Sequence, residues 1–394
     1  MILVFDAEDY GVRFLLRNTK SSFVLFGSIT NIGTEASTLN YHIRGEKQNI
    51  ELSEVNDVAE AVNWVKDFLI QKKFINDLSD IRIIGQRIVH GGSEFKVPTL
   101  ITETVVNKLH GLTELAPAHM SFNLQCVSAV KKYFPGIKQV GVFDTAFHST
   151  LPPYAYLYAI PYNYIQKYNI RRYGFHGISH KYMMEQALKL GGFDKNNSRI
   201  ITMHLGHGCS MTAIKNGVSV DTTMGFSPLE GLVMKERAGS VNFDVASFLH
   251  TKENLSFEEL NTTFYRFSGL YGLSGGLNSI EEIISEMEKG NEIAAQAFNV
   301  FIYTIRKQIG AYMLTLGGLD AIVMTGLLVK FSPIVRSFLF DDLNQFGIKL
   351  DPDKNDTYLD KKEGDISSSS SKVKIYYVKQ AIRMAISNEI EKML

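Results

Sequence analysis

The sequence predicts an α/β protein of two domains, each built on a mixed β-sheet. The chain has 394 residues, which is enough for two domains. A strand–turn–strand pattern near the N-terminus is echoed by a second one that begins at Arg199. Short β-branched runs alternate with stretches of helical periodicity, which is typical of sheets covered by helices. We expect domains at residues 1–147 and 148–381 with a cleft between them, and a terminal helix at 382–394 that packs back on the first domain.

The first domain opens with a strand at residues 2–5, and residues 12–16 resume the pattern after an acidic turn. Residues 22–30 are again rich in β-formers. Apolar residues recur at helical spacing over 58–69, and Asp57 is a suitable N-cap. The apolar, β-branched run at 81–90 reads as a buried strand that ends in a tight Gly-Gly turn.

The second domain repeats the opening pattern at residues 199–222, where Gly206 and Gly208 mark the turn. A long helical pattern follows at 293–314, and a buried strand at 321–325. A last strand at 373–378 precedes the short terminal helix. Two similar hairpin units, one early and one in mid-chain, indicate two related domains and not a short-period repeat.

Composition excludes several classes of function. Lys plus Arg number 41 and Asp plus Glu number 41, so the chain has no general attraction for nucleic acid or for an anionic membrane. Cys126 and Cys209 lack the spacing of zinc ligands, and two thiols in a chain of this length are typical of a reducing compartment. The N-terminus has no basic stretch of a signal peptide. We therefore expect a cytoplasmic protein.

Four segments place polar residues where a strand meets a turn, a position that favours a functional site. Taken singly, each signal is weak, and His176 alone is more typical of a structural histidine. The segments lie at residues 86–92, 142–148, 173–180 and 221–240.

Together these segments resemble the acetate kinase family. The family pattern R-V-V-H-G-G is similar to residues 87–92, F-D-T-A-F-H is identical at 143–148, and Y-G-F-H-G-x-S-H is identical at 173–180. Residues 116–119, 204–210 and 221–232 match A-P-L-H, H-L-G-N-G-x-S and D-T-S-M-G-F-T-P-L-E-G-L with a few substitutions. The resemblance implies two domains of the actin-like ATPase superfamily (the ASKHA, ribonuclease H-like fold), usually in a homodimer. It also implies a phosphotransferase that interconverts acetate, or another short-chain carboxylate, and its acyl phosphate.

The resemblance implies the roles of four catalytic residues. Arg87 and Arg237 correspond to the arginines that bind carboxylate and phosphoryl oxygens, groups that suit a guanidinium fork. His176 corresponds to a donor to the phosphoryl oxygens, and Asp144 to a residue that orients an arginine or the metal shell. Because a carboxylate is already ionised at pH 7, the reaction needs positioning and charge neutralisation more than a general base.

The resemblance also implies an apolar pocket for the acyl methyl group, formed by Val89, Ala118, Phe175 and Pro228. His119 supports the site from nearby. The family has leucine where this chain has Ala118, so we expect a roomier acyl pocket.

The phosphate-facing turn departs from the family pattern. Where the family has asparagine, glycine and serines, this chain has Asp6-Ala7-Glu8-Asp9-Tyr10-Gly11. Carboxylates there repel a triphosphate, and side chains block close approach of the backbone. Asp6 remains a candidate to hold Mg²⁺ through water, and Arg13 keeps the positive charge of the family's lysine.

The nucleotide loops of the second domain have changed as well. The family's T-G-G-I-G-E-N reads here as residues 325–331, in which Thr325 and Gly326 remain but two glycines and the asparagine are lost. The family's S-D-F-R, which holds adenine and ribose, corresponds to residues 278–281, and both its aspartate and its arginine are lost here. The family's P-T-N-E-E corresponds to residues 377–381, and its glutamates are lost. The remaining phosphate or nucleotide candidates are His204, Gly206, His207 and Gly208. We therefore expect ATP to bind weakly or not at all.

Three interpretations remain open. Nucleotide contacts are often made by the backbone, which tolerates side-chain change. Alternatively, the phosphoryl donor is ATP in an altered pose, pyrophosphate or phosphate. A different class of function is a pseudokinase that binds acetate or acetyl phosphate as a sensor or as the partner subunit of an active enzyme.

Overall fold

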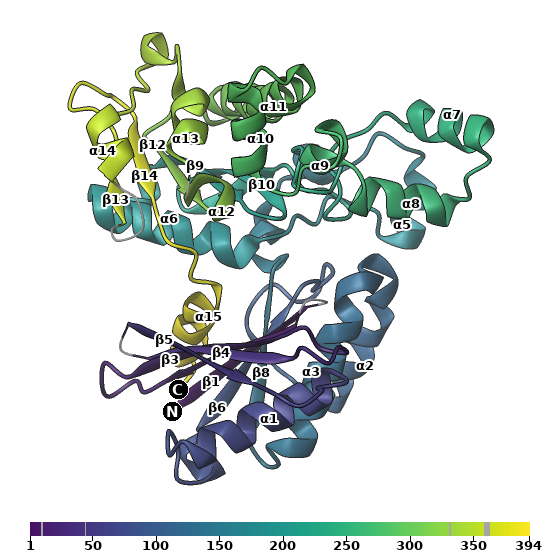
Figure 1. The fold of residues 1–394 in the computed structure, drawn as a ribbon, viewed down its shortest axis with the longest axis vertical. Coiled ribbons are helices and arrows are strands. Elements are labelled where there is room, and N and C mark those ends of the chain that lie inside the picture. Colours follow the sequence, from purple (N-terminus) through teal and green to yellow (C-terminus); the bar gives the residue numbers. More distant parts are fainter. Residues whose placement is uncertain (9–10, 44, 331, 358–362) are drawn as a thin grey trace. The chain divides into compact units, whose positions relative to one another are not determined.

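The chain divides into two compact units with one sheet each. In this computed structural model, the described residues are 1–8, 11–43, 45–330, 332–357 and 363–394. The first unit is Met1–Ala146 with Ala381–Leu394, and the second unit is Phe147–Gln380. Parallel and antiparallel pairs occur in both sheets, so the predicted α/β fold with two mixed sheets is confirmed (Figure 1).

The sheet of the first unit has the strand order β5-β4-β3-β2-β1-β6-β8-β7. Its strands are β1 (Ile2–Glu8), β2 (Gly11–Arg17), β3 (Val24–Thr30), β4 (Thr38–Ile43), β5 (Glu46–Glu51), β6 (Ile83–Ile88), β7 (Thr99–Leu100) and β8 (Lys138–Phe143). The pairs β1–β6 and β6–β8 are parallel, and the others are antiparallel. The first hairpin predicted from the sequence is therefore the centre of this sheet.

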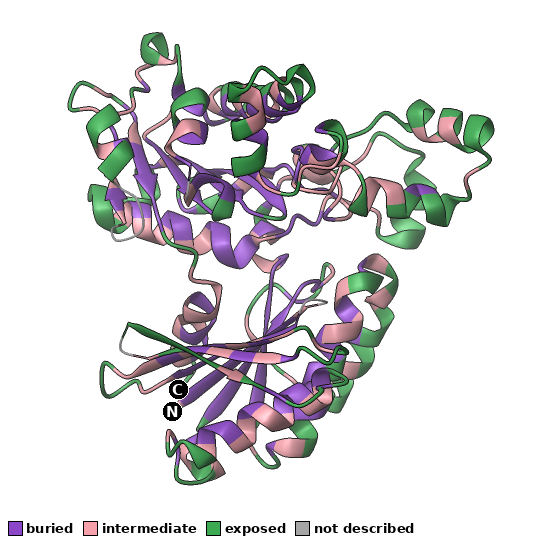
Figure 2. Ribbon diagram, in the orientation of Figure 1, coloured by how far each residue is buried: buried purple, intermediate pink, exposed green. Residues whose placement is uncertain are grey.

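Helices cover both faces of β1, which explains why this strand is apolar on both sides (Figure 2). On one face, Leu3 and Phe5 pack into a core with α1 (Val58–Gln71) and α3 (Pro117–Tyr133). The opposite face meets α15 (Ile382–Glu391), which contacts β1, β2 and β6. As predicted, Asp57 caps α1 and accepts a hydrogen bond from the backbone N–H of Glu60. The unit also contains α2 (Glu103–Gly111).

The sheet of the second unit has the order β11-β10-β9-β12-β14-β13. Its strands are β9 (Arg199–Leu205), β10 (Cys209–Lys215), β11 (Val218–Thr222), β12 (Ala321–Thr325), β13 (Gly364–Asp365) and β14 (Lys374–Tyr377). The pairs β9–β12 and β12–β14 are parallel. The segment β3-β2-β1-β6-β8 of the first sheet has the same arrangement as β11-β10-β9-β12-β14, so the two units are variants of one topology.

Two long helices flank the second sheet. The helix α6 (Gly177–Gly191) contacts β9 and β12, and α11 (Glu292–Leu316) contacts β9 and β10. The other helices are α4 (Pro153–Tyr156), α5 (Tyr162–Tyr168), α7 (Phe243–Glu253), α8 (Phe257–Arg266), α9 (Gly269–Leu273), α10 (Ile280–Glu288), α12 (Leu327–Lys330), α13 (Pro333–Phe340) and α14 (Pro352–Thr357). Among the helices that the structure describes, none combines the length and apolar character needed to cross a bilayer.

Candidate active site

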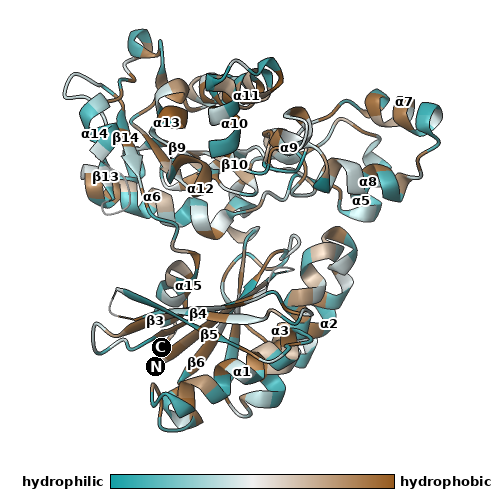
Figure 3. Ribbon diagram, in the orientation of Figure 1, coloured by the Kyte–Doolittle hydropathy of each residue, from teal (hydrophilic) through white to brown (hydrophobic). Residues whose placement is uncertain are grey.

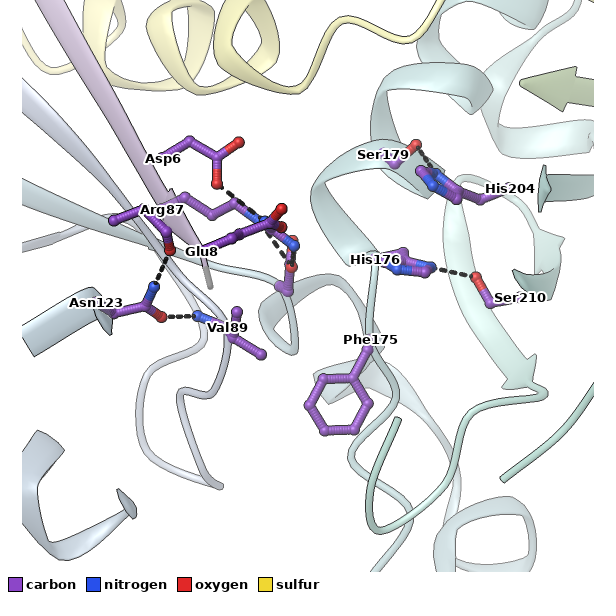
Figure 4. Close-up of polar contacts among 12 residues, drawn as sticks. Asp6, Glu8, Arg87, Val89, Asn123, Phe175, His176, Ser179, His204 and Ser210 are labelled. Carbon is purple, nitrogen blue, oxygen red and sulfur yellow. Dashed lines mark hydrogen bonds and ion pairs between the residues drawn. The ribbon is translucent and has the colours of Figure 1, made fainter. Parts of the chain in front are cut away.

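In the first unit, the ends of three neighbouring parallel strands bring charged side chains together. Arg87 lies near the end of β6, Asp144 follows β8, and Asp6 lies on β1. Arg87 donates from Nε and Nη2 to Asp144 Oδ2, at 3.0 and 2.7 Å, and from Nη1 to Asp6 Oδ1 at 2.9 Å (Figure 4). The side chains are only 7%, 2% and 2% exposed for Arg87, Asp6 and Asp144. Burial raises the pKa of Asp144 although Arg87 opposes the shift.

Glu8 joins this group as a bridge between two guanidinium groups. Its Oε1 accepts a hydrogen bond from Arg87 Nη1, and its Oε2 accepts one from Arg13 Nη1 at 2.7 Å. Arg13 faces the site because it pairs with Asp6 across the β1–β2 hairpin. Burial alone would raise the pKa of Glu8, but Arg87 and Arg13 outweigh it and hold that pKa far below its usual range.

A third guanidinium comes from the C-terminal helix. Arg383 Nη1 lies 4.0 Å from Asp6 Oδ2, and Arg13 Nη1 lies 3.9 Å from the same oxygen. Burial lowers the pKa of Arg383. We name these six residues the ion-pair cluster: Asp6, Glu8, Arg13, Arg87, Asp144 and Arg383. Three carboxylates face three guanidinium groups, so the cluster is electrically neutral.

Sequence reasoning missed Arg383, although a helical spacing signals it. Ser387 and Glu391 follow at i+4 and i+8, and both contact Arg17 on β2. One face of α15 is therefore directed at the first hairpin. That face reaches the ion-pair cluster because residues 381–394 belong to the first unit, although they follow the second unit in sequence.

The surroundings of Asp6 do not fit a divalent cation. Both carboxylate oxygens of Asp6 have guanidinium neighbours, and no cluster of three or more metal-ligating side chains occurs among the residues that the structure describes. A cation ligand needs an oxygen that faces away from fixed positive charge. These contacts favour an ion-pair role for Asp6 over the predicted metal role.

The predicted acyl-pocket residues of the first unit lie next to β6 and at the start of α3. The Val89 N–H donates to Asn123 Oδ1 at 2.8 Å, and Asn123 Nδ2 donates to the Ala7 carbonyl at 2.9 Å (Figure 4). Asn123, which sequence reasoning did not select, thus ties the end of β6 to β1. Ala118 is exposed and His119 is half-buried in the first turn of α3.

In the second unit, His176 is held by a chain of hydrogen bonds. His176 Nδ1 lies 2.9 Å from Ser210 Oγ (Figure 4). The same hydroxyl lies 2.7 Å from His180 Nε2. His180 Nδ1 continues the chain to Thr202 Oγ1 at 2.7 Å. Burial lowers the pKa of His180 well below its ordinary value, so this histidine is neutral.

His176 also has an unusual backbone. It is the N-cap of α6 with φ of 57° and ψ of 20°, a left-handed conformation that is uncommon outside glycine. Its ring stacks on that of His204 with 4.2 Å between centroids, and His204 Nδ1 bonds Ser179 Oγ at 2.8 Å. Strain of this kind is typical of functional positions.

Arg237 lies beside His176. A Cβ added to Gly208 would come within 3.1 Å of His176 Cε1 and 3.3 Å of Arg237 Nη1, so both side chains press against the same glycine. Arg237 Nη1 donates to the Pro228 carbonyl at 3.3 Å and lies 4.0 Å from Met234 Sδ. Within the described ranges, no carboxylate pairs with Arg237. In contrast to Arg87, Arg237 therefore retains donors for an anion.

The remaining predicted residues of the second unit divide into buried and exposed groups. Phe175 and Pro228 are buried, whereas His207 is exposed on the turn between β9 and β10. The backbone N–H of Gly206 donates to the Gly208 carbonyl at 3.1 Å and closes that turn. The turn predicted at these two glycines is therefore present.

The altered adenosine loop folds into α12. Gly326 has φ of 107°, and a Cβ there would lie 2.2 Å from the Leu205 carbonyl oxygen, so only glycine fits. Val329 is buried and its carbonyl accepts a hydrogen bond from the buried Arg336, whereas Leu327 is 44% exposed. Three positions on which the ATP expectation depends, Asp9, Tyr10 and Phe331, lie outside the described residues.

Comparison with known proteins agrees with this arrangement. Residues 1–388 match the model of the Acetokinase family. The chain belongs to this family. It is 40% identical over 397 residues to an acetate kinase from Thermoanaerobacterium thermosaccharolyticum, covering 100% of this chain and 98% of that protein. It is 41% identical over 381 residues to an acetate kinase from Thermotoga maritima, covering 96% and 94% of the two chains.

Solved structures of the acetokinase family share the whole fold. A Porphyromonas gingivalis acetate kinase superimposes with a TM-score of 0.91 at 35% identity, covering 100% of this chain and 99% of that one. A propionate kinase from Francisella tularensis gives a TM-score of 0.90 at 34% identity, with 98% of each chain covered. The family resemblance expected from the sequence motifs is therefore confirmed.

Proposed function

We propose that this acetokinase-family protein is a phosphotransferase that interconverts acetate, or another short-chain carboxylate, and its acyl phosphate. The observation that carries the proposal is Arg237, a guanidinium without a carboxylate partner in the described structure, next to the imidazole of His176. Several relatives with about this chain's length are named acetate kinase, which supports the same reaction.

These residues supply what phosphoryl transfer to a carboxylate needs. The acceptor carboxylate is ionised at neutral pH, so the main barrier is repulsion between two anions. Arg237 neutralises charge on the phosphoryl group, and His176, oriented by Ser210, donates a hydrogen bond to it. In the second unit, the buried Phe175 and Pro228 provide apolar surface for the acyl chain.

We propose that ATP binds weakly and that pyrophosphate is a candidate donor, because transfer of one of its phosphoryl groups to a carboxylate releases phosphate as the leaving group. Glu8 places a negative charge where the family has glycine, and α12 carries leucine and valine where the family has small or polar residues. A triphosphate needs positive charge and open backbone at such a turn. Asp6 is paired to Arg87, and the described residues of the first unit contain no group of three side chains that could hold a metal ion, so we assign no catalytic step to Mg²⁺.

One experiment tests the function and its donor together. Acetyl phosphate formation is measured with ATP, GTP, pyrophosphate and phosphate side by side, and magnesium-ATP binding is measured by calorimetry. We expect turnover that depends on Arg237 and is lost in Arg237→Met. Tight ATP binding would contradict the weak-donor proposal, and an unchanged rate in Arg237→Met would contradict the site.

The second candidate is a binding protein without turnover. One observation favours it: the hydrogen-bond donors of Arg87 already face Asp6, Glu8 and Asp144. Acetyl phosphate binding without product from any donor would support this pseudokinase. Products from any donor would exclude it.

We also propose that the protein is a homodimer in solution. The helix α7 buries none of its residues within the chain, and it exposes Phe243 and Phe248 at 76% and 60%. Part of this helix is hydrophobic (Figure 3). Aromatic side chains on an uncovered helix are typical of a protein interface.

A further inference from the structure

The carboxylate of Glu8 spans two guanidinium groups in the way that a bound anion does. One oxygen faces Arg87 Nη1 and the other lies 2.7 Å from Arg13 Nη1. Two oxygens that accept from two arginines is the arrangement by which proteins hold phosphoryl and carboxylate groups. The place that a small oxyanion would take in the first unit is therefore filled by a side chain of the protein itself.

Glu8 differs from the other two carboxylates of the ion-pair cluster in its access to water. Its side chain is 23% exposed, whereas those of Asp6 and Asp144 are each 2% exposed. Glu8 can therefore leave Arg87 for solvent, while Asp6 and Asp144 keep the guanidinium in place. When Glu8 leaves, two carboxylates face three guanidinium groups, and the cluster gains one net positive charge.

We propose that Glu8 is an internal competitor, which occupies the anion position between Arg87 and Arg13 until a small oxyanion displaces it. This inference rests on the proposed function and deepens it by naming the class of ligand. When an acetate monoanion replaces Glu8, one carboxylate takes the place of another, and the net charge of the site is unchanged. A phosphate dianion, free or as an acyl phosphate, brings an additional negative charge to the positive cluster. The first unit thus selects acyl phosphate or phosphate over free carboxylate.

Protonation does not release the competitor near neutral pH. Burial favours the neutral form of Glu8, but Arg87 and Arg13 hold its pKa far below the usual range. The site therefore opens when Glu8 moves to solvent with its charge, and a stronger anion then takes its place. Since a ligand binds only the fraction of molecules in which the site is open, the competitor lowers apparent affinity by that fraction.

The test is calorimetry with inorganic phosphate and with acetate on the full chain and four variants. Glu8→Gln removes the charge, and Glu8→Asp keeps the charge but is one methylene too short to bridge both arginines. If Glu8 closes the site in nine molecules of ten, both variants bind phosphate about tenfold more tightly than the parent chain. Glu391→Gln, which neutralises a carboxylate paired with Arg17 in the same unit, leaves phosphate affinity unchanged.

Each outcome decides the question. Unchanged phosphate affinity in Glu8→Gln overturns the inference. A gain in affinity in Glu8→Gln with none in Glu8→Asp also overturns it, because the gain then comes from removing a negative charge and not from opening the bridge. The gain in phosphate affinity is expected to vanish in Glu8→Gln/Arg13→Met. A gain that persists in this double variant shows that phosphate binds at another site and overturns the inference. Thermal melts confirm that each variant is folded. Because no turnover is measured, a chain inactive with every donor contradicts the proposed function and leaves this inference standing.

Discussion

Asp144 accepts two hydrogen bonds from Arg87 through a single oxygen, Oδ2, at 3.0 Å from Nε and 2.7 Å from Nη2. Arg87 lies on β6 opposite Val142 of β8, and Asp144 follows β8; the two strands pair in parallel. The register of two strands thus decides which acid holds the arginine. Since both side chains are buried, each depends on the other for its charge to be compensated.

Asp144→Asn is expected to destabilise the first unit by about 3–5 kcal/mol, because it leaves a buried guanidinium with one fewer carboxylate. Urea unfolding measures the effect. The matched control is Glu391→Gln, whose partner Arg17 is on the surface, with 22% and 37% of the arginine and glutamate side chains exposed. That control should cost no more than about 1 kcal/mol. Equal losses in the two variants would contradict a special role for Asp144.

Ser210→Ala is expected to lower the turnover number by about fivefold, because the hydrogen bond that orients His176 is worth about 1 kcal/mol. The Michaelis constant should change little, since Ser210 touches no predicted substrate group. Ser219→Ala is the matched control: it removes a similar bond, 3.0 Å from Ser219 Oγ to His148 Nδ1. Steady-state kinetics on both variants should show a loss in the first only. A similar fall in both would indicate general damage to the second unit.

Ala118 is expected to admit a longer acyl chain than leucine would. Met120 is fully buried and Phe122 packs against the core, so neither is placed to refill the space. Each added methylene that is buried should strengthen binding by about 0.8 kcal/mol, or roughly fourfold. Propionyl phosphate should then bind at least as well as acetyl phosphate, and Ala118→Leu should reverse the order. A steep fall from acetyl to propionyl in the parent chain would show that the space is filled.

Acid is expected to destabilise the second unit through buried histidines. His148 Nε2 donates to the Phe175 carbonyl at 3.0 Å, and burial lowers its pKa to about 4. Because the unfolded histidine titrates near 6.5, the unfolded state binds more protons below that pH, and stability falls between pH 6.5 and 4. By pH 5 the loss is on the order of 2 kcal/mol for His148.

The pH dependence is measured by thermal unfolding at pH 7 and pH 5. His148→Asn should be less stable at pH 7 but should lose less between the two values. The exposed His110 is the control, and His110→Gln should keep the full pH dependence of the parent chain. An identical dependence in His148→Asn would exclude His148 as a source.

Phe248→Asp is expected to convert the proposed homodimer into a monomer, because a buried, unpaired carboxylate at an interface is costly. Light scattering after size exclusion measures the mass. Val97→Asp changes an exposed residue of the first unit, 64% exposed, and should leave the dimer intact. A monomeric parent chain would contradict the dimer itself.

The sequence alone determined the architecture. Hairpins that begin at Ile2 and Arg199, buried runs at residues 81–90 and 321–325, and the capped helix after Asp57 predict two α/β units, and the structure has them. Such patterns are local, since burial imposes periods of 2 and 3.6 residues on the chain. The motifs around Arg87, His176 and Arg237 likewise indicated the family, because they are contiguous in sequence.

The tertiary structure decided what these residues do to one another. The sequence showed Glu8 as a negative charge at the phosphate-facing turn. Its bridge to Arg87 and Arg13 depends on the pairing of β1 with β2 and β6. Arg383 comes within 4.0 Å of Asp6 only because α15 returns to the first sheet. Ion pairs between residues 79 or more positions apart leave no periodic signal in the chain. Their energies depend on distance and burial, which the fold alone provides.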